Sequence, residues 1–372
     1  MKRTTKTLLF ALAGMPLLTI SSTAEEKFTS LFNGKDLSGW VTVGTKGSFK
    51  VDNGTIRTTG AHPYPSWLRS EKEYENFVLK FSYKPKAWYE GGVLIHAPEH
   101  GPGSMLGMKL HLTHTTHPYG THSTGAIYKA AAPLAIPLTP KKWNQIEITC
   151  DWPKLQVKMN GTLIQNIDMS KNPAFKHRLR RGYIGLQNIC NSNAFYKDIQ
   201  IRTLPDQEKW TSLFASGLAG LKLEGKSKWT IEEDTLTAKG NNAMAWSKEK
   251  FTAPYEFQVW VKTMVNVNGG VVFNSNEGKR GVEIQCFNTP DTTNPTGSLY
   301  GIAPASHLVS RDEEWFLIQL FNNGASAEVF VNGEKVSETK NLKPPYSGFF
   351  GFQQHTPKGH VSYRSARIRK IR

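Results

Sequence analysis

The stretch Gly182-Tyr183-Ile184-Gly185-Leu186-Gln187 decides the fold, because it returns later in the chain as Gly348-Phe349-Phe350-Gly351-Phe352-Gln353. Other landmarks recur in the same order, and the offset between the copies drifts only slowly. They include Gly91-Gly92-Val93 with Gly269-Gly270-Val271, and Asn160-Gly161 with Asn332-Gly333. A repeat of this length predicts a duplicated domain rather than a solenoid of short units.

The region before the first copy has the pattern of a secretory signal. Lys2 and Arg3 precede an apolar run, and small residues Ser22-Thr23-Ala24 follow it. We therefore predict a signal peptide at 1–24 and export to the periplasm or the extracellular space. The apolar run is short for a membrane span, so the protein is not expected to span a bilayer. The two copies are predicted to form domains at 25–205 and 206–372.

Within each copy, the apolar residues have a period of two. Phe77, Leu79 and Phe81 alternate with residues of the opposite face, as do Phe257 and Val259 in the second copy. Such alternation predicts strands with one buried face. The Asn-Gly pairs predict tight hairpin turns, because type I′ turns need positive φ at both central residues. We therefore predict an all-β protein made of two tandem β-sandwiches.

Composition and missing motifs restrict the function. The formal charge is +16, but Lys and Arg are scattered along the chain, so a nucleic-acid partner is not expected. The three cysteines, Cys150, Cys190 and Cys286, leave at least one without an intramolecular partner. The sequence contains no GxSxG, HExxH, P-loop or EF-hand motif. It also lacks a Glu-x-Asp-x-x-Glu strand, so a retaining mechanism with two carboxylates has no obvious carriers.

Histidines are concentrated in the first copy. If Lys109-Leu110-His111 is a strand, Lys109 and His111 share a face, and His96 lies on an earlier strand. Imidazole titrates near neutral pH, so these residues are candidates for a general base. His114, His117 and His122 follow on a loop and are candidate metal ligands, although their spacing fits no standard metal motif. The alternative for this segment is a polar, solvated loop.

Glu283 and Gln285 occupy the equivalent strand of the second copy. They would share one face, where a carboxylate beside an amide suits base catalysis or hydrogen bonding to vicinal hydroxyls. Glycines such as Gly269-Gly270 permit a bulge or the close approach of a ligand. Asn274 follows them and is a candidate donor to a hydroxyl group. The alternative is an exposed polar strand face.

Aromatic side chains form the last group of candidates. Trp88, Tyr128 and Tyr300 offer flat apolar surfaces on which a sugar ring can stack. The alternative for each of them is packing in the core.

The opening Leu31-Phe32-Asn33-Gly34-Lys35-Asp36-Leu37-Ser38-Gly39-Trp40 resembles the start of the 3-keto-disaccharide hydrolase-like family. The Glu-x-Gln strand, the Gly-Ala-Ile-Tyr segment, the Asn-Gly hairpins and the Gly-x-Ile-Gly-Leu-Gln strand are similar to later motifs of that family. The resemblance covers nearly all of the chain after residue 24, twice. It implies two tandem concanavalin-like jelly-roll sandwiches. It also implies cleavage of 3-keto-glycosides, by hydrolysis or by 1,2-elimination and hydration.

Such chemistry needs a base, a group that stabilises an enolate oxygen and a proton donor for the leaving group. The resemblance leaves the cofactor open, with a divalent metal as a candidate. Copy one has Lys109 and His111 where the family has Glu-x-Gln. Copy two keeps Glu283 and Gln285 but lacks the opening motif.

Our hypothesis from the sequence is that copy one is catalytic through His111, and that copy two binds glycan or shapes the cleft. His96, Lys109 and Glu283 are further catalytic candidates. Two alternatives remain open at this stage. One is a non-catalytic carbohydrate-binding or adhesion protein. The other is a structural domain of the cell surface that binds no sugar.

Overall fold

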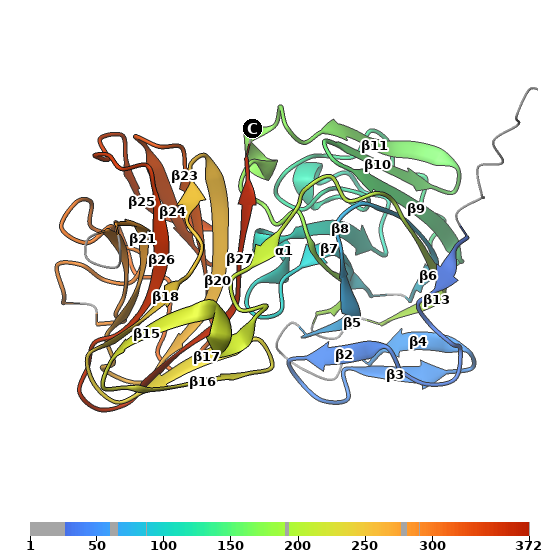
Figure 1. Cartoon of the computed structure of the whole chain (residues 1–372). Coiled ribbons are helices and arrows are strands. Elements are labelled where there is room, and N and C mark those ends of the chain that lie inside the picture. Colours follow the sequence, from blue (N-terminus) through green and yellow to red (C-terminus); the bar gives the residue numbers. More distant parts are fainter. Residues whose placement is uncertain are drawn as a thin grey trace, which may run out of the picture.

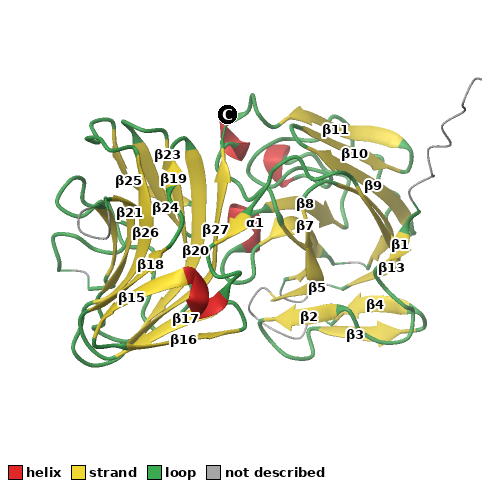
Figure 2. Ribbon diagram, in the orientation of Figure 1, coloured by secondary structure: helices red, strands yellow, loops and turns green. Residues whose placement is uncertain are grey.

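The computed structural model describes residues 27–59, 66–86, 88–189, 193–276, 281–289 and 291–371. The segment 1–24, which is predicted to be a signal peptide, lies outside the described residues, and so does Cys190. Two halves built from strands stand side by side, the first coloured blue to green and the second yellow to red (Figure 1). Strands dominate both halves (Figure 2). The predicted all-β class is confirmed.

The first half is a β-sandwich of two antiparallel sheets. The long sheet has the order β11(Thr162–Asp168)-β10(Lys154–Met159)-β9(Asn144–Asp151)-β6(Phe77–Pro85)-β13(Ala194–Thr203)-β4(Thr55–Thr58)-β3(Phe49–Asp52), and β1(Thr29–Ser30) pairs with β13. The short sheet has the order β2(Trp40–Val43)-β5(Ser66–Tyr74)-β12(Gly182–Asn188)-β7(Glu90–Ala97)-β8(Met108–Thr113). Helical turns lie in the loops, namely α1(Gly103–Leu106), η1(Gly120–His122) and η2(Pro173–Phe175).

The second half repeats this strand order and adds one short strand. Its long sheet has the order β16(Lys228–Glu232)-β17(Thr235–Lys239)-β27(His360–Lys370)-β20(Tyr255–Thr263)-β23(Phe316–Asn322)-β24(Ala327–Val331)-β25(Glu334–Thr339), with β14(Thr211–Ser212) beside β27. Its short sheet has the order β15(Leu221–Gly225)-β18(Ala243–Ser247)-β26(Ser347–Gln354)-β21(Gly269–Ser275)-β22(Val282–Cys286), with β19(Phe251–Thr252) beside β26 and η3(Gly217–Gly220) before β15. Because both halves share one strand order, the sequence repeat reflects two copies of the same jelly-roll sandwich.

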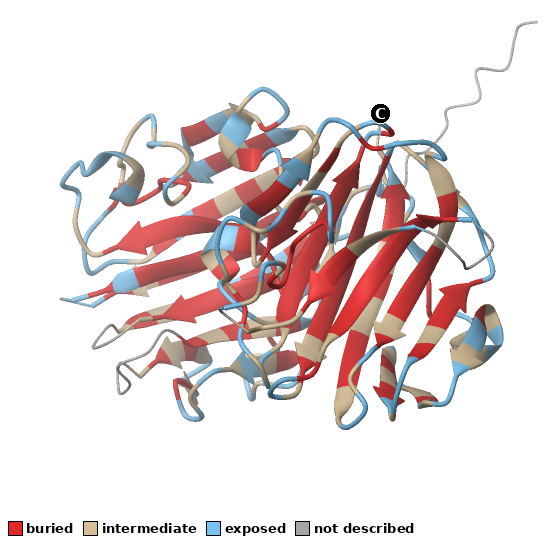
Figure 3. Cartoon of the chain, turned by 90° about the vertical axis from the view of Figure 1, so that its left-hand side faces the viewer, coloured by how far each residue is buried: buried red, intermediate tan, exposed pale blue. Residues whose placement is uncertain are grey.

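Each sandwich has its own hydrophobic core between its two sheets. In the first, Phe77 and Leu110 are among the buried residues; in the second, Phe257 and Ile284 are. Buried residues run along the strands, and the exposed ones gather in loops and turns (Figure 3). Cys150 and Cys286 are buried free thiols. The core therefore uses one side chain in two along each strand, which leaves the alternate side chains for the opposite face of each sheet.

The hairpin turns have the geometry that the Asn-Gly pairs predict. Asn160 and Gly161 have φ of 49° and 81°, and the pair Asn332-Gly333 has φ of 52° and 84°. Both central residues are therefore left-handed, as a type I′ turn requires. The turn between β16 and β17 has the same signs of φ at Glu233 and Asp234, 46° and 58°, without a glycine. No Asn-Gly pair or other turn signal in the sequence predicts that turn.

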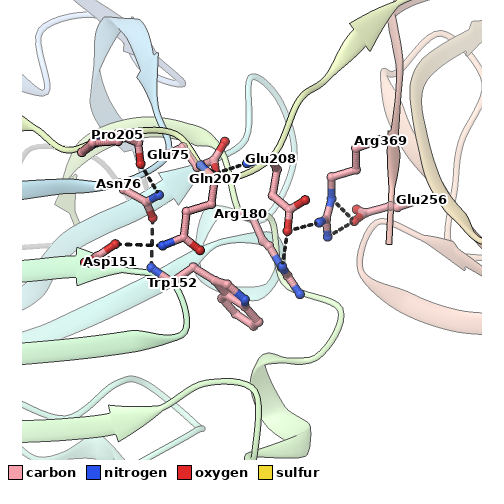
Figure 4. Close-up of polar contacts among 10 residues, drawn as sticks. All are labelled: Glu75, Asn76, Asp151, Trp152, Arg180, Pro205, Gln207, Glu208, Glu256 and Arg369. Atoms are coloured by element: carbon pink, nitrogen blue, oxygen red, sulfur yellow. Dashed lines mark hydrogen bonds and ion pairs between the residues drawn. The ribbon is translucent and has the colours of Figure 1, made fainter. Parts of the chain in front are cut away.

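The two sandwiches meet through an apolar contact and a set of ion pairs. Leu106 and Leu179 of the first half pack against Trp260 and Leu317 of the second. Beside them, the buried guanidinium of Arg369 contacts Glu256 at 2.5 Å and the linker residue Glu208 at 2.9 Å (Figure 4). Since Glu208 also accepts a hydrogen bond of 3.0 Å from Arg180 of the first half, the network joins both domains through the linker.

The linker between the domains is attached to the first sandwich. The backbone N–H groups of Gln207 and Glu208 donate to one carboxylate oxygen of Glu75, at 3.0 and 3.1 Å. The Asn76 amide donates to Pro205 O at 2.9 Å, and Gln207 donates to Asp151 at 3.1 Å (Figure 4). Burial raises the pKa of Glu75 despite these bonds. The linker is thus held by directed bonds over several successive residues rather than left free.

Replacing Arg369 with Ala should destabilise the protein by about 3–5 kcal/mol, because it leaves the carboxylate of Glu256 buried without its cationic partner. Lys335→Ala, which removes an exposed pair with Glu338, is the control and should cost less than about 1 kcal/mol. Urea unfolding of both variants measures the difference. Equal costs would contradict the role given to Arg369.

Candidate functional site

A row of polar side chains lies on the short sheet of the second copy, on the face opposite the hydrophobic core. Gln285 on the edge strand β22 pairs with Gly270 on β21, and Gly270 pairs with Gln353 on β26. Glu283 lies two residues before Gln285, on the same face, because Ile284 between them is in the core. The Oε1 atom of Gln285 is buried and has no hydrogen-bond partner in the described part of the chain. The face therefore offers a carboxyl group and two amides together.

Glycines on the central strands make room for the large side chains of this face. A Cβ atom at Gly270 would clash with the carboxylate of Glu283, and one at Gly351 would clash with the indole ring of Trp246. The Glu283 side chain therefore extends from β22 over Gly270 of β21, and the Trp246 side chain extends from β18 over Gly351 of β26. The indole N–H of Trp246 donates to Glu224 at 3.1 Å. Gly270, one of the glycines for which the sequence predicted a close approach, and Gly351 thus lie beneath the large side chains of this face.

The carboxyl group of Glu283 has a strongly altered acidity. Burial raises the pKa of Glu283 to about 7, because the ionised form loses hydration. Among the described residues, which exclude 277–280, no ion pair or hydrogen bond to its carboxylate is found that would lower the pKa again. A carboxyl with a pKa near neutrality can both accept and release a proton at neutral pH, which is the requirement for general acid–base work.

The equivalent face of the first copy carries different groups in the same places. His111 on β8 pairs with Gly92 on β7, Gly92 pairs with Gln187 on β12, and Gln187 pairs with Trp67 on β5. Three buried polar atoms of this row have no partner among the described residues: His111 Nδ1, Gln187 Oε1 and Trp67 Nε1. A buried polar atom left without a partner is costly, so the row is suited to a ligand that supplies the missing hydrogen bonds.

Lys109, His111 and Tyr128 form a contact group on this face. The Lys109 ammonium lies 3.9 Å from the centre of the Tyr128 ring, and the His111 ring lies 5.3 Å from it. Burial lowers the pKa of Lys109 to about 8. Burial, together with Lys109 and His122, lowers the pKa of His111 to about 3. At neutral pH His111 is therefore an uncharged imidazole beside a cationic Lys109.

A loop covers the edge strand in each copy. In the first, Tyr128 N–H donates to Lys109 O at 2.9 Å and His111 N–H donates to Ala126 O at 2.8 Å. In the second, Tyr300 N–H donates to Glu283 O at 2.9 Å and Gln285 N–H donates to Ser298 O at 3.0 Å. These bonds fix the backbone from which the polar side chains of the two faces project.

Two predicted site residues lie elsewhere. His96 and Asn274 have φ of 54° and 53° at irregularities in β7 and β21, and both side chains are buried on the core side. The two ring nitrogens of His96 lie 3.0 and 2.7 Å from the backbone carbonyls of Leu179 and Glu75, and the uncharged ring donates to one of them. Asn274 Oδ1 is near Tyr255 OH at 3.3 Å and accepts from Asn322 at 3.2 Å. His96 therefore does not lie on the face that carries His111, so the prediction that it is a catalytic base is not supported.

The histidines predicted as metal ligands have separate partners. His114 lies against Trp88 with ring centres 5.0 Å apart, His117 lies against Tyr119, and His122 lies against Tyr128. Within the residues that the structure describes, no three His, Cys, Asp or Glu side chains come close enough together to hold a metal ion. His114, His117 and His122 therefore do not fit a shared metal ion.

Two of the predicted stacking aromatics are well exposed. Trp88 is 76% exposed and Tyr300 is 53% exposed, so their faces are open to solvent. Tyr128 is half-buried over Lys109. The sequence analysis missed Gln187 and Gln353 as site residues. Their place in the repeated Gly-x-x-Gly-x-Gln strand, two residues after a glycine, was the signal that could have found them.

Both halves of the chain match one protein family. The family described as the 3-keto-alpha-glucoside-1,2-lyase-like domain matches residues 27–202 and again residues 209–369. The chain belongs to this family. Both members of the tandem are thus lyase-like domains, and each of the two polar faces lies on the short sheet of one of them. No curated protein sequence matches the chain.

Solved structures also resemble this lyase-like tandem. A protein of Parabacteroides distasonis described as a candidate glycosyl hydrolase is 21% identical, with a TM-score of 0.43 over 48% of this chain and 94% of its own. A carbohydrate-binding module of Bacillus subtilis is 12% identical, with a TM-score of 0.35 over 44% of this chain and 96% of its own.

The helices in the described part of the chain are too short or too polar to cross a membrane.

The raised pKa of Glu283 makes stability depend on pH. Between about pH 4.5 and pH 7 the folded protein keeps a proton that the unfolded chain has released, so stability falls as the pH rises through this window. The change in unfolding free energy that Glu283→Gln causes, relative to the wild type, should therefore be more favourable at pH 8 than at pH 4, by about 3 kcal/mol. Urea unfolding at both pH values measures this, with the exposed Glu249→Gln as the control. No difference between the two variants would contradict the assignment.

Proposed function

We propose that the protein is an exported enzyme that cleaves 3-keto-glycosides, and that Glu283 is its general base. The observation that carries this proposal is the carboxyl group of Glu283, with a pKa of about 7, on a polar sheet face beside Gln285. Membership in the lyase-like family supports the class of substrate.

The chemistry follows from a ketone at C3, which acidifies the proton on C2. The Glu283 carboxylate takes that proton, and the electron pair of the C2–H bond forms an enolate with the C3 carbonyl. The enolate returns to the ketone as the C1–O bond breaks, which leaves a C1=C2 double bond. The departing oxygen takes the proton from the Glu283 carboxyl, and water then adds across C1=C2. Amide N–H groups of Gln285 and Gln353 are the donors for the enolate oxygen.

This assignment moves the base from copy one to copy two. Proton transfer is most effective when the pKa of the catalytic group lies near the working pH. Glu283, at about 7, satisfies that condition, whereas His111, at about 3, is a weak base. The sequence hypothesis had favoured His111 because of the ordinary pKa of imidazole, which burial changes.

A second candidate function, carbohydrate binding without catalysis, fits the first copy. The row of Trp67, Gln187 and His111 presents three buried polar atoms without partners, which suits a ligand rich in hydroxyl groups. Lys109 adds a cation beside them. In this proposal copy one holds the glycan and copy two performs the elimination.

Turnover of a 3-keto-glycoside tests the assignment. Glu283→Gln should lower kcat/KM by about 10²–10⁴-fold, the usual effect of removing a general base. His111→Ala should mainly raise KM, with kcat changed by less than about tenfold. A wild-type kcat/KM that falls about tenfold for each pH unit below pH 7 is also expected. Full activity of Glu283→Gln, or loss of kcat in His111→Ala alone, would return the base to copy one.

Export is tested separately from catalysis. Expression of the full chain in a bacterial host should give a periplasmic or secreted protein whose N-terminal residue is Glu25, since the small residues before it suit a signal peptidase. N-terminal sequencing of the purified protein gives the answer. A mature protein that retains Met1 in the cytoplasm would contradict this part of the proposal.

A further inference from the structure

A cavity of about 530 Å³ lies between the two sandwiches. The first domain contributes Glu73 of β5 and Tyr183 of β12 to its wall, and the second contributes Trp260 of β20 and Arg367 of β27. The volume lies within the range of sites that hold small molecules, and such sites occur preferentially between domains. The exposed residues Lys72 and Ser212 are part of its lining, so the cavity is connected to solvent.

Ion pairs that cross from one domain to the other hold the walls of this cleft. The Arg367 guanidinium donates to Glu73 at 2.8 Å, and the Arg364 guanidinium contacts Glu99 at 2.7 Å. Arg181 of the first domain contacts the same Glu73 carboxylate at 3.5 Å. Because these ion pairs join the two domains without a ligand, the walls of the cleft are in place before any ligand arrives.

The charges of the lining indicate a neutral ligand. Three carboxylates, Glu73, Glu99 and Asp234, are balanced by three cations, Lys72, Arg181 and Arg367. A charged ligand would leave an uncompensated charge in a partly desolvated space, which is costly. A neutral molecule with many hydroxyl groups can donate to the carboxylates and accept from the guanidinium groups at once.

Aromatic side chains supply the apolar part of the lining. Tyr183, Trp210 and Trp260 line the cleft and give part of its wall an apolar character. The indole N–H of Trp210 is buried and has no hydrogen-bond partner within the described ranges. A buried donor without a partner on the wall of the cleft is a place for a hydroxyl oxygen of the ligand.

We propose that this interdomain cleft is a binding site for a neutral saccharide, distinct from the polar faces of the two short sheets. Tyr183 lies four residues from Gln187 on β12, which places the cleft roughly 13 Å along the strand from the His111 row. The site exists only when both copies are present, since each contributes part of the wall. It does not depend on the catalytic role proposed for Glu283.

Calorimetric titration of the full chain tests the proposal. The Glu283→Gln variant is used so that turnover does not interfere, and it is titrated with glucose, maltose and cellobiose, and with glucuronate and glucosamine as charged comparators. At least one neutral sugar should bind more tightly than both charged ones. Adding Ser212→Trp, which fills the cleft from its rim, should weaken that binding at least tenfold.

Two matched variants make the test specific. Thr211→Trp places the same bulk on the adjacent exposed residue, which is not part of the lining, and should leave binding unchanged. Ser212→Ala removes only the hydroxyl that accepts from Phe214 N–H at 3.2 Å, and should also bind as the parent does. Equal binding by Ser212→Trp and Thr211→Trp, tighter binding of a charged sugar, or no binding of any neutral sugar would overturn the proposal.

Discussion

The buried guanidinium of Arg369 is the contact on which the arrangement of the two sandwiches depends. It lies near the end of β27, a strand of the second domain that runs beside the first (Figure 1). It contacts Glu256 of its own domain and Glu208 of the linker. Glu208 also binds Arg180 of the first domain (Figure 4). Two cations and two carboxylates compensate one another, so none of these charges is buried alone. Trp260 and Leu317, which pack against Leu106 of the first domain, also line the cleft between the domains.

Duplication kept the scaffold and changed the chemistry. Both short sheets retain a glycine in the middle of the polar row, Gly92 and Gly270, and a glutamine beside it. At the edge strand, however, Lys109 and His111 stand where Glu283 and Gln285 stand in the other copy. One face is therefore cationic with an uncharged imidazole, and the other carries a carboxyl group near neutral pKa. The same backbone thus supports two different environments for a polar ligand.

Much of this arrangement could be predicted from the sequence, because the side-chain period of two is a local property. Alternation placed Lys109 with His111 and Glu283 with Gln285 on shared faces, and the Asn-Gly pairs gave the turns. The misplacement of His96 and Asn274 has a physical cause. Each residue sits at a strand irregularity with positive φ, which reverses the face to which its side chain points, and such an irregularity leaves no mark in the alternation. The ion pairs of Arg369 and the cleft join residues far apart in the chain, so no local pattern predicts them.

The loops that cover β8 and β22 have a consequence for how the molecule meets its neighbours. Both strands are the last of their sheets, and an outermost strand normally presents free N–H and C=O groups to which another polypeptide can pair. Here the segments that end at Tyr128 and Tyr300 already occupy those groups. Edge-to-edge association into larger assemblies is therefore blocked along the two borders that carry the polar residues. Self-association by strand pairing would have to use another border of a sandwich.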